Sequence, residues 1–273
     1  MQHHRITDAE LEQVIRFFQA ESGIRLSSQK KSLICGRLNI RLNALNIDCY
    51  QQYLTFIRQP AHAAEKQLAI DLLTTNETYF YREPKHFEFL DRLFTSWREG
   101  RPPAIWSAAC SSGEEPFTLS MLMYEHFESR PWKILASDLS QRMLSTAEKG
   151  IYPLTRAKEL PEAWLKKYCL KGQGDYDGYL KIQGFLQEKV DFRQINLSRP
   201  LPLENAFDII FLRNVLIYFD PEAKERLIRT LLQHLKGSGL LILGHSESLN
   251  GMNLPLKAIQ PSIYQKAIQH GEH

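Results

Sequence analysis

From Pro103 onward, short runs of β-forming residues alternate with stretches of helical periodicity. Predicted helices cover Glu115 to Phe127, Ser140 to Glu148 and Pro221 to Leu235. The predicted strands lie around them, at Ile105 to Ala109, Ile134 to Ser137, Val190 to Gln194, Asp208 to Leu212 and Leu240 to Leu243. Such alternation is typical of a parallel sheet with helices on both faces. We therefore expect a doubly wound α/β domain.

Residues 1–72 show a different pattern, with apolar positions at helical spacing and no strand signals. Thr7 and Glu10 have the spacing of a capping box that opens a first helix, and Gly23 is placed to close it. This part of the chain is expected to form an all-α domain. A linker helix over 73–90, carrying the segment NETYFYRE at 76–83, would join it to an α/β domain over 91–273.

One glycine-rich stretch interrupts the α/β alternation. Lys171 to Leu186 contains four glycines around short alternating runs such as Tyr179 to Ile182. This density of turn residues indicates a small antiparallel insertion at about 170–188. Such an insertion is either a decorated loop without a function of its own or a surface that contacts a partner.

The composition is that of an ordinary globular protein. The chain has 273 residues, of which 43% are hydrophobic and 24% charged, and its longest apolar runs fall far short of a bilayer span. The start of the chain lacks the apolar region of a secretion signal, so we expect a cytoplasmic protein. The four cysteines are scattered and lack metal-ligand spacing, and no metal site is expected.

The net charge of +3 is too small to indicate a nucleic-acid partner, but part of it is concentrated. No acidic residue lies between Glu21 and Asp48. On a helix, Lys30, Arg37 and Arg41 fall within about 40° of one another and form a basic ridge. The ridge is either a solvated helix face or a surface that docks an acidic partner.

Ligands of open α/β sheets bind outside the carboxyl ends of the strands, so the strand ends are the place to look for a site. The first predicted strand runs into a turn of small residues with two carboxylates, Glu114 and Glu115, before a helix. Carboxylates there repel phosphate and attract a cationic ligand. Asp138 follows the second strand, where an acidic residue can accept hydrogen bonds from ribose hydroxyls. A ribose without pyrophosphate, together with a positive centre, describes S-adenosylmethionine.

Each of these residues also has a structural interpretation. Asp138 is equally suited to cap the next helix, and Glu114 and Glu115 are ordinary charges for the first turn of a helix. Only their order along the chain favours a methyltransferase.

Five blocks of the sequence, in order, resemble the CheR chemotaxis-receptor methyltransferases. They are 76–83 (NETYFYRE), 106–116 (WSAACSSGEEP), 136–138 (ASD), 211–220 (FLRNVLIYFD) and 244–247 (GHSE). The likeness covers nearly the whole chain, including the helical domain and the glycine-rich insertion. Two departures are Tyr81, where members often have Phe, and Cys110, where they often have Ala.

The resemblance implies an enzyme that transfers methyl groups from S-adenosylmethionine to glutamate side chains on cytoplasmic chemoreceptor helices, leaving S-adenosylhomocysteine. It implies a class I methyltransferase sheet, and in some members the antiparallel insertion binds a peptide at the receptor's carboxyl terminus. By the resemblance, Tyr218 matches a tyrosine close to the transferred methyl. From the chemistry of the reaction, we expect Arg82 and the Tyr218 hydroxyl to share the incoming carboxylate. The residues implied at the cofactor are Asn76, Thr78, Arg82, Glu115, Asp138, Asn196, Leu197, Arg213 and Asn214.

Three other functions are weaker. The first is an enzyme that uses the same cofactor on nucleic acid or a small molecule, since fold alone does not fix the substrate. It would need aromatic residues beside the basic ridge, which segment 22–47 lacks. A non-catalytic adaptor that senses the cofactor would tolerate a damaged site, yet Arg82, Asp138 and Tyr218 are present. The segment GHSES at 244–248 lacks the second glycine of the serine-hydrolase elbow.

Overall fold

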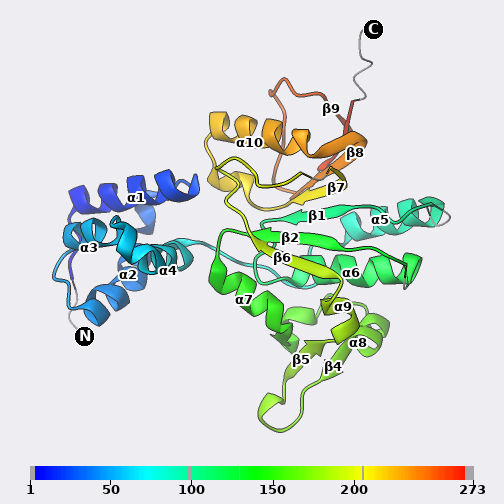
Figure 1. Cartoon of the computed structure of the whole chain (residues 1–273), viewed down its shortest axis with the longest axis horizontal. Helices are drawn as coiled ribbons and strands as arrows, with labels where there is room; N and C mark the ends of the chain where they lie inside the picture. Colours follow the sequence, from blue (N-terminus) through cyan, green and yellow to red (C-terminus); the bar gives the residue numbers. More distant parts are fainter. Residues whose placement is uncertain (1–3, 98–99, 129, 205, 268–273) are drawn as a thin grey trace.

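The computed structural model describes residues 4–97, 100–128, 130–204 and 206–267. An N-terminal helical domain stands beside a larger α/β domain and is joined to it by an extended segment (Figure 1). No helix in these ranges is both long and apolar enough to cross a bilayer.

The described part of the N-terminal domain is all-α, as predicted. Its α-helices are α1 (Asp8–Ser22), α2 (Lys31–Leu45), α3 (Tyr50–Ile57) and α4 (Ala63–Leu73). Their apolar faces meet in one core, which includes the fully buried Val14, Phe18, Ile34 and Leu42. Because burial of an amphipathic face supplies most of a helix's stability, these helices depend on one another.

The predicted ends of α1 are confirmed. The Glu10 backbone N–H donates to the Thr7 hydroxyl at 3.2 Å, and the Thr7 N–H donates to the Glu10 carboxylate at 3.0 Å. Gly23 ends the helix with φ 74°, a left-handed conformation that favours glycine. A Cβ at Gly23 would also lie 1.8 Å from the Ser198 hydroxyl, so only glycine allows this close approach of the two domains.

The predicted linker helix over 73–90 is wrong. Helix α4 ends at Leu73, residues 74–83 are not helical, and α5 begins only at Pro84 (Pro84–Trp97). Two residues of this segment, Tyr81 and Glu83, have left-handed φ angles of 62° and 60°. A proline also disfavours helical geometry in the residue before it, while suiting the first turn of the helix that follows. The predicted boundary at residue 91 falls inside α5.

The α/β domain is built on a seven-stranded sheet in the order β6-β2-β1-β7-β8-β10-β9. The strands β1 (Ile105–Ala108), β2 (Ile134–Asp138), β6 (Val190–Gln194), β7 (Phe207–Leu212) and β8 (Leu235–Leu243) are parallel to their neighbours in this part of the sheet. Each contains a predicted strand or most of it. The doubly wound architecture is therefore confirmed.

Helices cover both faces of this sheet. On one face, α5 and α6 (Glu114–Phe127) pack on alternate strand residues such as Ile105, Ile209 and Ile242. On the other, α10 (Pro221–Gln233) packs on the intervening residues, among them Trp106 and Ile210. Alternation of side chains along each strand produces these two cores. Helix α7 (Gln141–Lys149) belongs to a third core with α6 and the insertion.

Two strands of this sheet were not predicted, β9 (Leu256–Gln260) and β10 (Ile263–Lys266). They form an antiparallel pair, and β10 pairs with β8, so the sheet is mixed at this edge. Every residue of β9 is at least partly exposed, which removes the pattern of buried residues by which a strand is recognised.

The glycine-rich insertion is antiparallel, as predicted, but it starts earlier in the chain than residue 170. Strand β5 (Tyr179–Ile182) lies between β3 (Ile151–Pro153) and β4 (Cys169–Lys171). Helix α8 (Glu162–Tyr168) connects β3 to β4, and the short α9 (Gly184–Gln187) follows β5.

Candidate functional site

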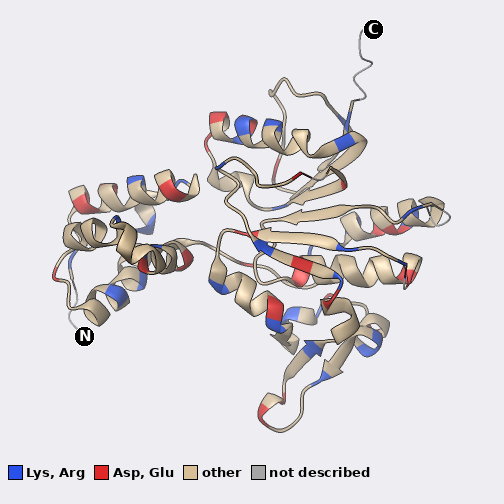
Figure 2. Cartoon of the chain, in the orientation of Figure 1, with Lys and Arg blue, Asp and Glu red and all other residues tan. Residues whose placement is uncertain are grey.

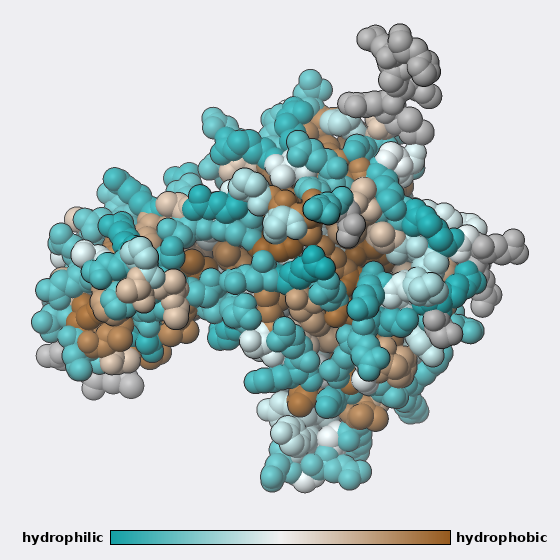
Figure 3. Space-filling view, in the orientation of Figure 1, coloured by the Kyte–Doolittle hydropathy of each residue, from teal (hydrophilic) through white to brown (hydrophobic). Residues whose placement is uncertain are grey.

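A cavity of about 280 Å³ lies at the carboxyl ends of the parallel strands, where the helical domain meets the sheet. Its wall combines Ile24 and Leu26 of the helical domain, the segment after α4, and the turns after β1, β2, β6 and β7. Apolar side chains are visible in the hollow between the two domains (Figure 3). The cavity is thus both apolar and lined by strand ends, as ligand sites of α/β proteins usually are.

All ten residues predicted for the cofactor and for catalysis line this one cavity. They are Asn76, Thr78, Arg82, Glu115, Asp138, Asn196, Leu197, Arg213, Asn214 and Tyr218. The three predicted docking residues, Lys30, Arg37 and Arg41, do not line it.

The turn after β1 has an unusual backbone. Ala109 and Ser111 have left-handed φ angles of 62° and 50°, and Gly113 has a φ of 95°. A Cβ at Gly113 would lie 2.7 Å from Ala147 Cβ, so glycine is required for the packing of α7 as well as for the turn. Left-handed non-glycine residues cost free energy and concentrate at functional sites. This turn forms one side of the cavity.

Asp138 is buried beside that turn. Its two carboxylate oxygens accept the N–H groups of Ser111 and Ser140, each at 2.8 Å. The cap of α7 is not Asp138 but Ser140, whose hydroxyl accepts the Met143 N–H. Burial raises the pKa of Asp138, while the two backbone N–H groups act in the opposite direction. Each oxygen keeps lone pairs for hydroxyl donors of a ligand.

The two carboxylates at the start of α6 point to different partners. Glu114 is fully buried and forms an ion pair with Arg156, and the Ser112 hydroxyl donates to it at 2.7 Å. Glu115 faces the cavity and accepts the Ser107 hydroxyl at 2.7 Å. Only Glu115 is therefore available to a ligand, and Glu114 ties the base of the insertion to the cavity turn.

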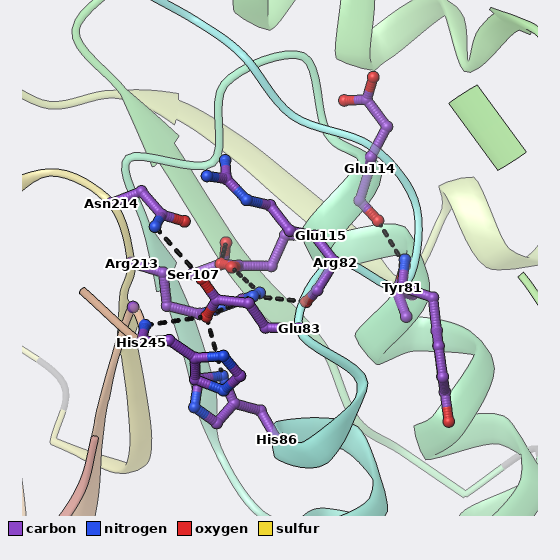
Figure 4. A network of polar contacts seen from close by, with 12 residues as sticks. Tyr81, Arg82, Glu83, His86, Ser107, Glu114, Glu115, Arg213, Asn214 and His245 are labelled. Atoms are coloured by element: carbon purple, nitrogen blue, oxygen red, sulfur yellow. Dashed lines mark hydrogen bonds and ion pairs between the residues drawn. The ribbon is translucent and has the colours of Figure 1, made fainter. Parts of the chain in front are cut away.

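A buried guanidinium connects the segment before α5 with the sheet (Figure 4). Arg213, whose side chain is 3% exposed, pairs with Glu115 at 2.9 Å and with Glu83 at 3.0 Å, and also donates to the Arg82 carbonyl oxygen. Burial raises the pKa of Glu83, but the charge and hydrogen bonds of Arg213 outweigh it and hold that pKa below its usual range. Removing one partner of such a buried pair typically costs about 3–5 kcal/mol.

Arg82 and Tyr218 lie near each other in the cavity wall. One nitrogen of the Arg82 guanidinium donates to the Glu77 carbonyl oxygen at 2.7 Å. A guanidinium has five N–H groups, so others are left to donate to a ligand. Burial raises the pKa of the Tyr218 hydroxyl, and the positive charge of Arg82 opposes part of that shift. The hydroxyl therefore stays protonated at neutral pH and can donate a hydrogen bond.

The remaining predicted ligands are partly used inside the protein. The Asn76 side chain donates to the Thr74 hydroxyl at 3.0 Å. The Asn196 amide donates to the Glu21 carbonyl oxygen at 2.6 Å and accepts the Ser198 N–H at 2.9 Å. Asn196 thus fastens the turn after β6 to helix α1, and both Asn196 and Leu197 line the cavity.

Sequence reasoning missed Glu247, which lies in the turn after β8 and is 6% exposed. Its carboxylate accepts four backbone N–H groups: those of Val215 and Leu216 on one oxygen, and those of Asn214 and Gly244 on the other, at 2.7–2.8 Å. It therefore fixes the turn between β7 and Tyr218. The sequence signal that could have identified Glu247 is its position in the segment GHSE, immediately after a predicted strand.

The predicted basic ridge is wrong for two of its three residues. Arg41 forms two hydrogen bonds with Glu65, at 2.7 and 2.9 Å, and Arg37 donates to the Leu72 and Thr74 carbonyl oxygens. Figure 2 shows basic segments of α2 near acidic segments of α4. These guanidinium groups join helices of the same domain. Only Lys30 lies toward the cavity side, 5.7 Å from the centre of the Tyr218 ring.

Comparison with known proteins gives a consistent result along the chain. Residues 76–264 match the family described as CheR methyltransferase, SAM binding domain, and residues 9–74 match the CheR methyltransferase all-alpha domain. A chemotaxis protein methyltransferase of Borreliella burgdorferi is 36% identical, over 96% of this chain and 95% of its own length. The chemotaxis protein methyltransferase of Salmonella typhimurium is 34% identical, over 90% of this chain and 86% of its own. Chemotaxis protein methyltransferase 2 of Pseudomonas aeruginosa is 35% identical, over 97% and 96%.

Proposed function

The chain belongs to the CheR family of S-adenosylmethionine-dependent methyltransferases, and from this premise we propose that it methylates glutamate side chains on cytoplasmic chemoreceptor helices. The product would be a glutamyl methyl ester, which makes the enzyme a protein-glutamate O-methyltransferase. The observation that supports this best is that Asp138, Glu115, Arg82 and Tyr218 line a single cavity.

The residues of the cavity fit S-adenosylmethionine. Asp138 offers free lone pairs to ribose hydroxyls, and Glu115 offers a negative charge near the expected cationic end of the cofactor. We propose that Asn76, Thr78, Asn196, Leu197 and the Arg213 to Asn214 turn complete the binding site.

Bound S-adenosylmethionine supplies the electrophilic methyl group. A substrate glutamate, with an ordinary pKa of about 4.3, is already ionised at neutral pH, so no general base is required. The task of the protein is then to hold one carboxylate oxygen in line for attack and to exclude water. Correct orientation of reacting groups contributes up to roughly 7–11 kcal/mol to a rate enhancement.

We assign this orientation to Arg82 and Tyr218. The free N–H groups of Arg82 donate to the incoming carboxylate, and the protonated Tyr218 hydroxyl donates a second bond. Sharing the carboxylate between two donors leaves the attacking oxygen more electron-rich than a full bidentate pairing with arginine would.

The function is tested with purified protein, methyl-labelled S-adenosylmethionine and the cytoplasmic fragment of a chemoreceptor. We expect the label to appear on glutamate side chains, located by mass spectrometry, and to be released by mild base as an ester is. Cofactor binding without any label on the receptor fragment would instead favour the non-catalytic adaptor.

Arg82→Ala is expected to reduce methyl transfer more than tenfold and to change cofactor affinity less. The reason is that a charge-assisted hydrogen bond contributes about 1.5–3 kcal/mol. A radiolabel assay measures the first quantity and calorimetry with S-adenosylhomocysteine the second. Lys85→Ala, which removes an exposed cation three residues away, is the matched control. Equal losses in the two measurements would make Arg82 a cofactor ligand instead.

Tyr218→Phe is expected to lower the turnover number about tenfold, because it removes the hydroxyl donor and keeps the ring. Steady-state kinetics with the receptor fragment measure this change. Tyr124→Phe, at a partly buried tyrosine outside the cavity, should leave turnover unaltered. Full turnover in Tyr218→Phe would show that the tyrosine only packs.

We further propose two contacts with the receptor, both on the cytoplasmic side of the membrane. At the cavity, the exposed Tyr79 and Ile217 offer two apolar side chains to an acidic amphipathic helix, and Lys30, beside the Tyr218 ring, offers a cation. At the insertion, the edge strand β4 and the exposed Leu170 are suited to pair with a receptor carboxyl-terminal peptide in extended form.

A further inference from the structure

Three potential metal ligands gather beside Arg213, where α5 begins (Figure 4). They are Glu83, His86 and His245, and one ligand atom of each lies within 4.8 Å of the other two. Glu83 and His86 are close in sequence, whereas His245 follows β8. No metal-ligand spacing is visible along the chain, because only the fold brings His245 to the other two residues.

His86 has an unsatisfied nitrogen that points into this cluster. Its ring is 1% exposed, and Nδ1 has no hydrogen-bond partner. Nε2 lies 2.9 Å from the Ser262 hydroxyl oxygen, and that hydroxyl donates to the Pro261 carbonyl oxygen at 2.7 Å. We therefore assign the ring proton to Nε2, which leaves a bare lone pair on Nδ1. A buried acceptor without a donor requires an explanation.

The Glu83 carboxylate lies close to that lone pair, and it too is an acceptor. Glu83 Oε2 lies 3.5 Å from His86 Nδ1, too far for a good hydrogen bond. Two ligands bound tetrahedrally to Zn²⁺ at about 2.0–2.1 Å are about 3.4 Å apart. The observed separation therefore suits two ligands of one metal ion better than a direct bond between them.

We propose that Glu83, His86 and His245 form a Zn²⁺ site, with water as a fourth ligand. Two imidazoles and one carboxylate are a common zinc ligand set. The bond from His86 Nε2 to Ser262 is the outer contact that orients metal-binding histidines. His245 is exposed, and its ring centre is 4.7 Å from that of His86, so it can close the site from the solvent side.

The charge around the cluster permits the site to bind a cation with modest affinity. Glu83 and Glu115 carry two negative charges against the single charge of Arg213, which leaves one net negative charge. Arg213 and the backbone N–H of His245 already donate to Glu83 Oε2, so the metal would share this oxygen. When bound, Zn²⁺ would join the start of α5 to the turn after β8.

The test uses the full chain and metal ions alone, without cofactor or receptor. Titration calorimetry should find one Zn²⁺ equivalent in the wild type that is at least tenfold weaker in His245→Ala. Zn²⁺ should also raise the melting temperature of the wild type more than that of this variant, because a ligand of the native state stabilises it. His245 is exposed, so the variant is expected to fold.

The control is His126→Ala, which removes another histidine paired with a carboxylate, Asp91, at 2.7 Å. This variant should bind Zn²⁺ as the wild type does. Any Zn²⁺ binding at His4, near the chain start, is common to all the proteins compared and does not affect the difference between them. His245→Cys with Co²⁺ should add a thiolate charge-transfer band that the wild type lacks. Equal Zn²⁺ affinity of the wild type and His245→Ala, or no such band, would overturn the proposal.

Discussion

Glu247→Gln is expected to reduce methyl transfer at least a hundredfold and to destabilise the protein by roughly 2–6 kcal/mol. Each Glu247 oxygen accepts two backbone N–H groups. A glutamine keeps one oxygen, so its amide nitrogen would face two N–H donors. Two buried N–H groups then lose their acceptor, and the turn that carries Arg213 and Tyr218 is released.

Urea denaturation and the radiolabel assay measure these two effects, with the assay run at a temperature where circular dichroism shows the variant to be folded. Glu222→Gln is the matched control, because it makes the same change at a side chain that is 88% exposed. Turnover within threefold of the wild type in Glu247→Gln would mean that other contacts hold the turn.

Asp138→Asn is expected to weaken cofactor binding about 30-fold, equivalent to roughly 2 kcal/mol of lost hydrogen bonding to a charged group. The amide would also oppose one of the two N–H donors, from Ser111 or Ser140, that the carboxylate accepts. Calorimetry with S-adenosylhomocysteine measures the affinity.

Ser140→Ala separates the two effects of that change. It removes the cap of α7, at a cost of about 1 kcal/mol, and leaves the Asp138 carboxylate in place. Its cofactor affinity should stay near that of the wild type. A comparable loss of affinity in both variants would assign the effect to the turn and not to the carboxylate.

Cofactor affinity should also depend on pH, through the carboxyl group of Asp138. Burial raises the pKa of Asp138, so its carboxylate takes up a proton at a higher pH than an ordinary aspartate. Hydroxyl donors of a ligand favour the ionised form, and cofactor affinity should therefore fall as the pH drops through that pKa. The fall should be absent in Asp138→Asn, which has no proton to gain at this position.

The sequence was sufficient for the parts of the fold that rest on local periodicity. Five strands and the main helices of the α/β domain were predicted because buried runs and amphipathic stretches are visible along the chain. The ten site residues share one cavity because carboxyl ends of parallel strands converge at one edge. Family resemblance supplied the residues of segment 76–82, which lie before the first strand.

The errors have their cause in contacts between distant segments. Local pattern favours a helix around Tyr81 and Glu83, but Arg213 and Asn214 hold Glu83 in a left-handed conformation. The basic ridge was assigned from one helix, while the acid that pairs with Arg41 lies on another. Glu247 binds backbone groups of a different turn, which no spacing of residue types reveals.

The last turn of α1 is hydrogen-bonded to the α/β domain. The carbonyl oxygens of Ala20, Glu21 and Ser22 accept hydrogen bonds from Arg199, Asn196 and Ser198 of the α/β domain. Carbonyl groups at a helix end otherwise rely on water or on a local cap. Gly23 caps α1 locally, but these three carbonyl groups are satisfied by the other domain. The N-terminal segment expressed alone would therefore fray at this turn, whose last residue, Ser22, lines the cavity.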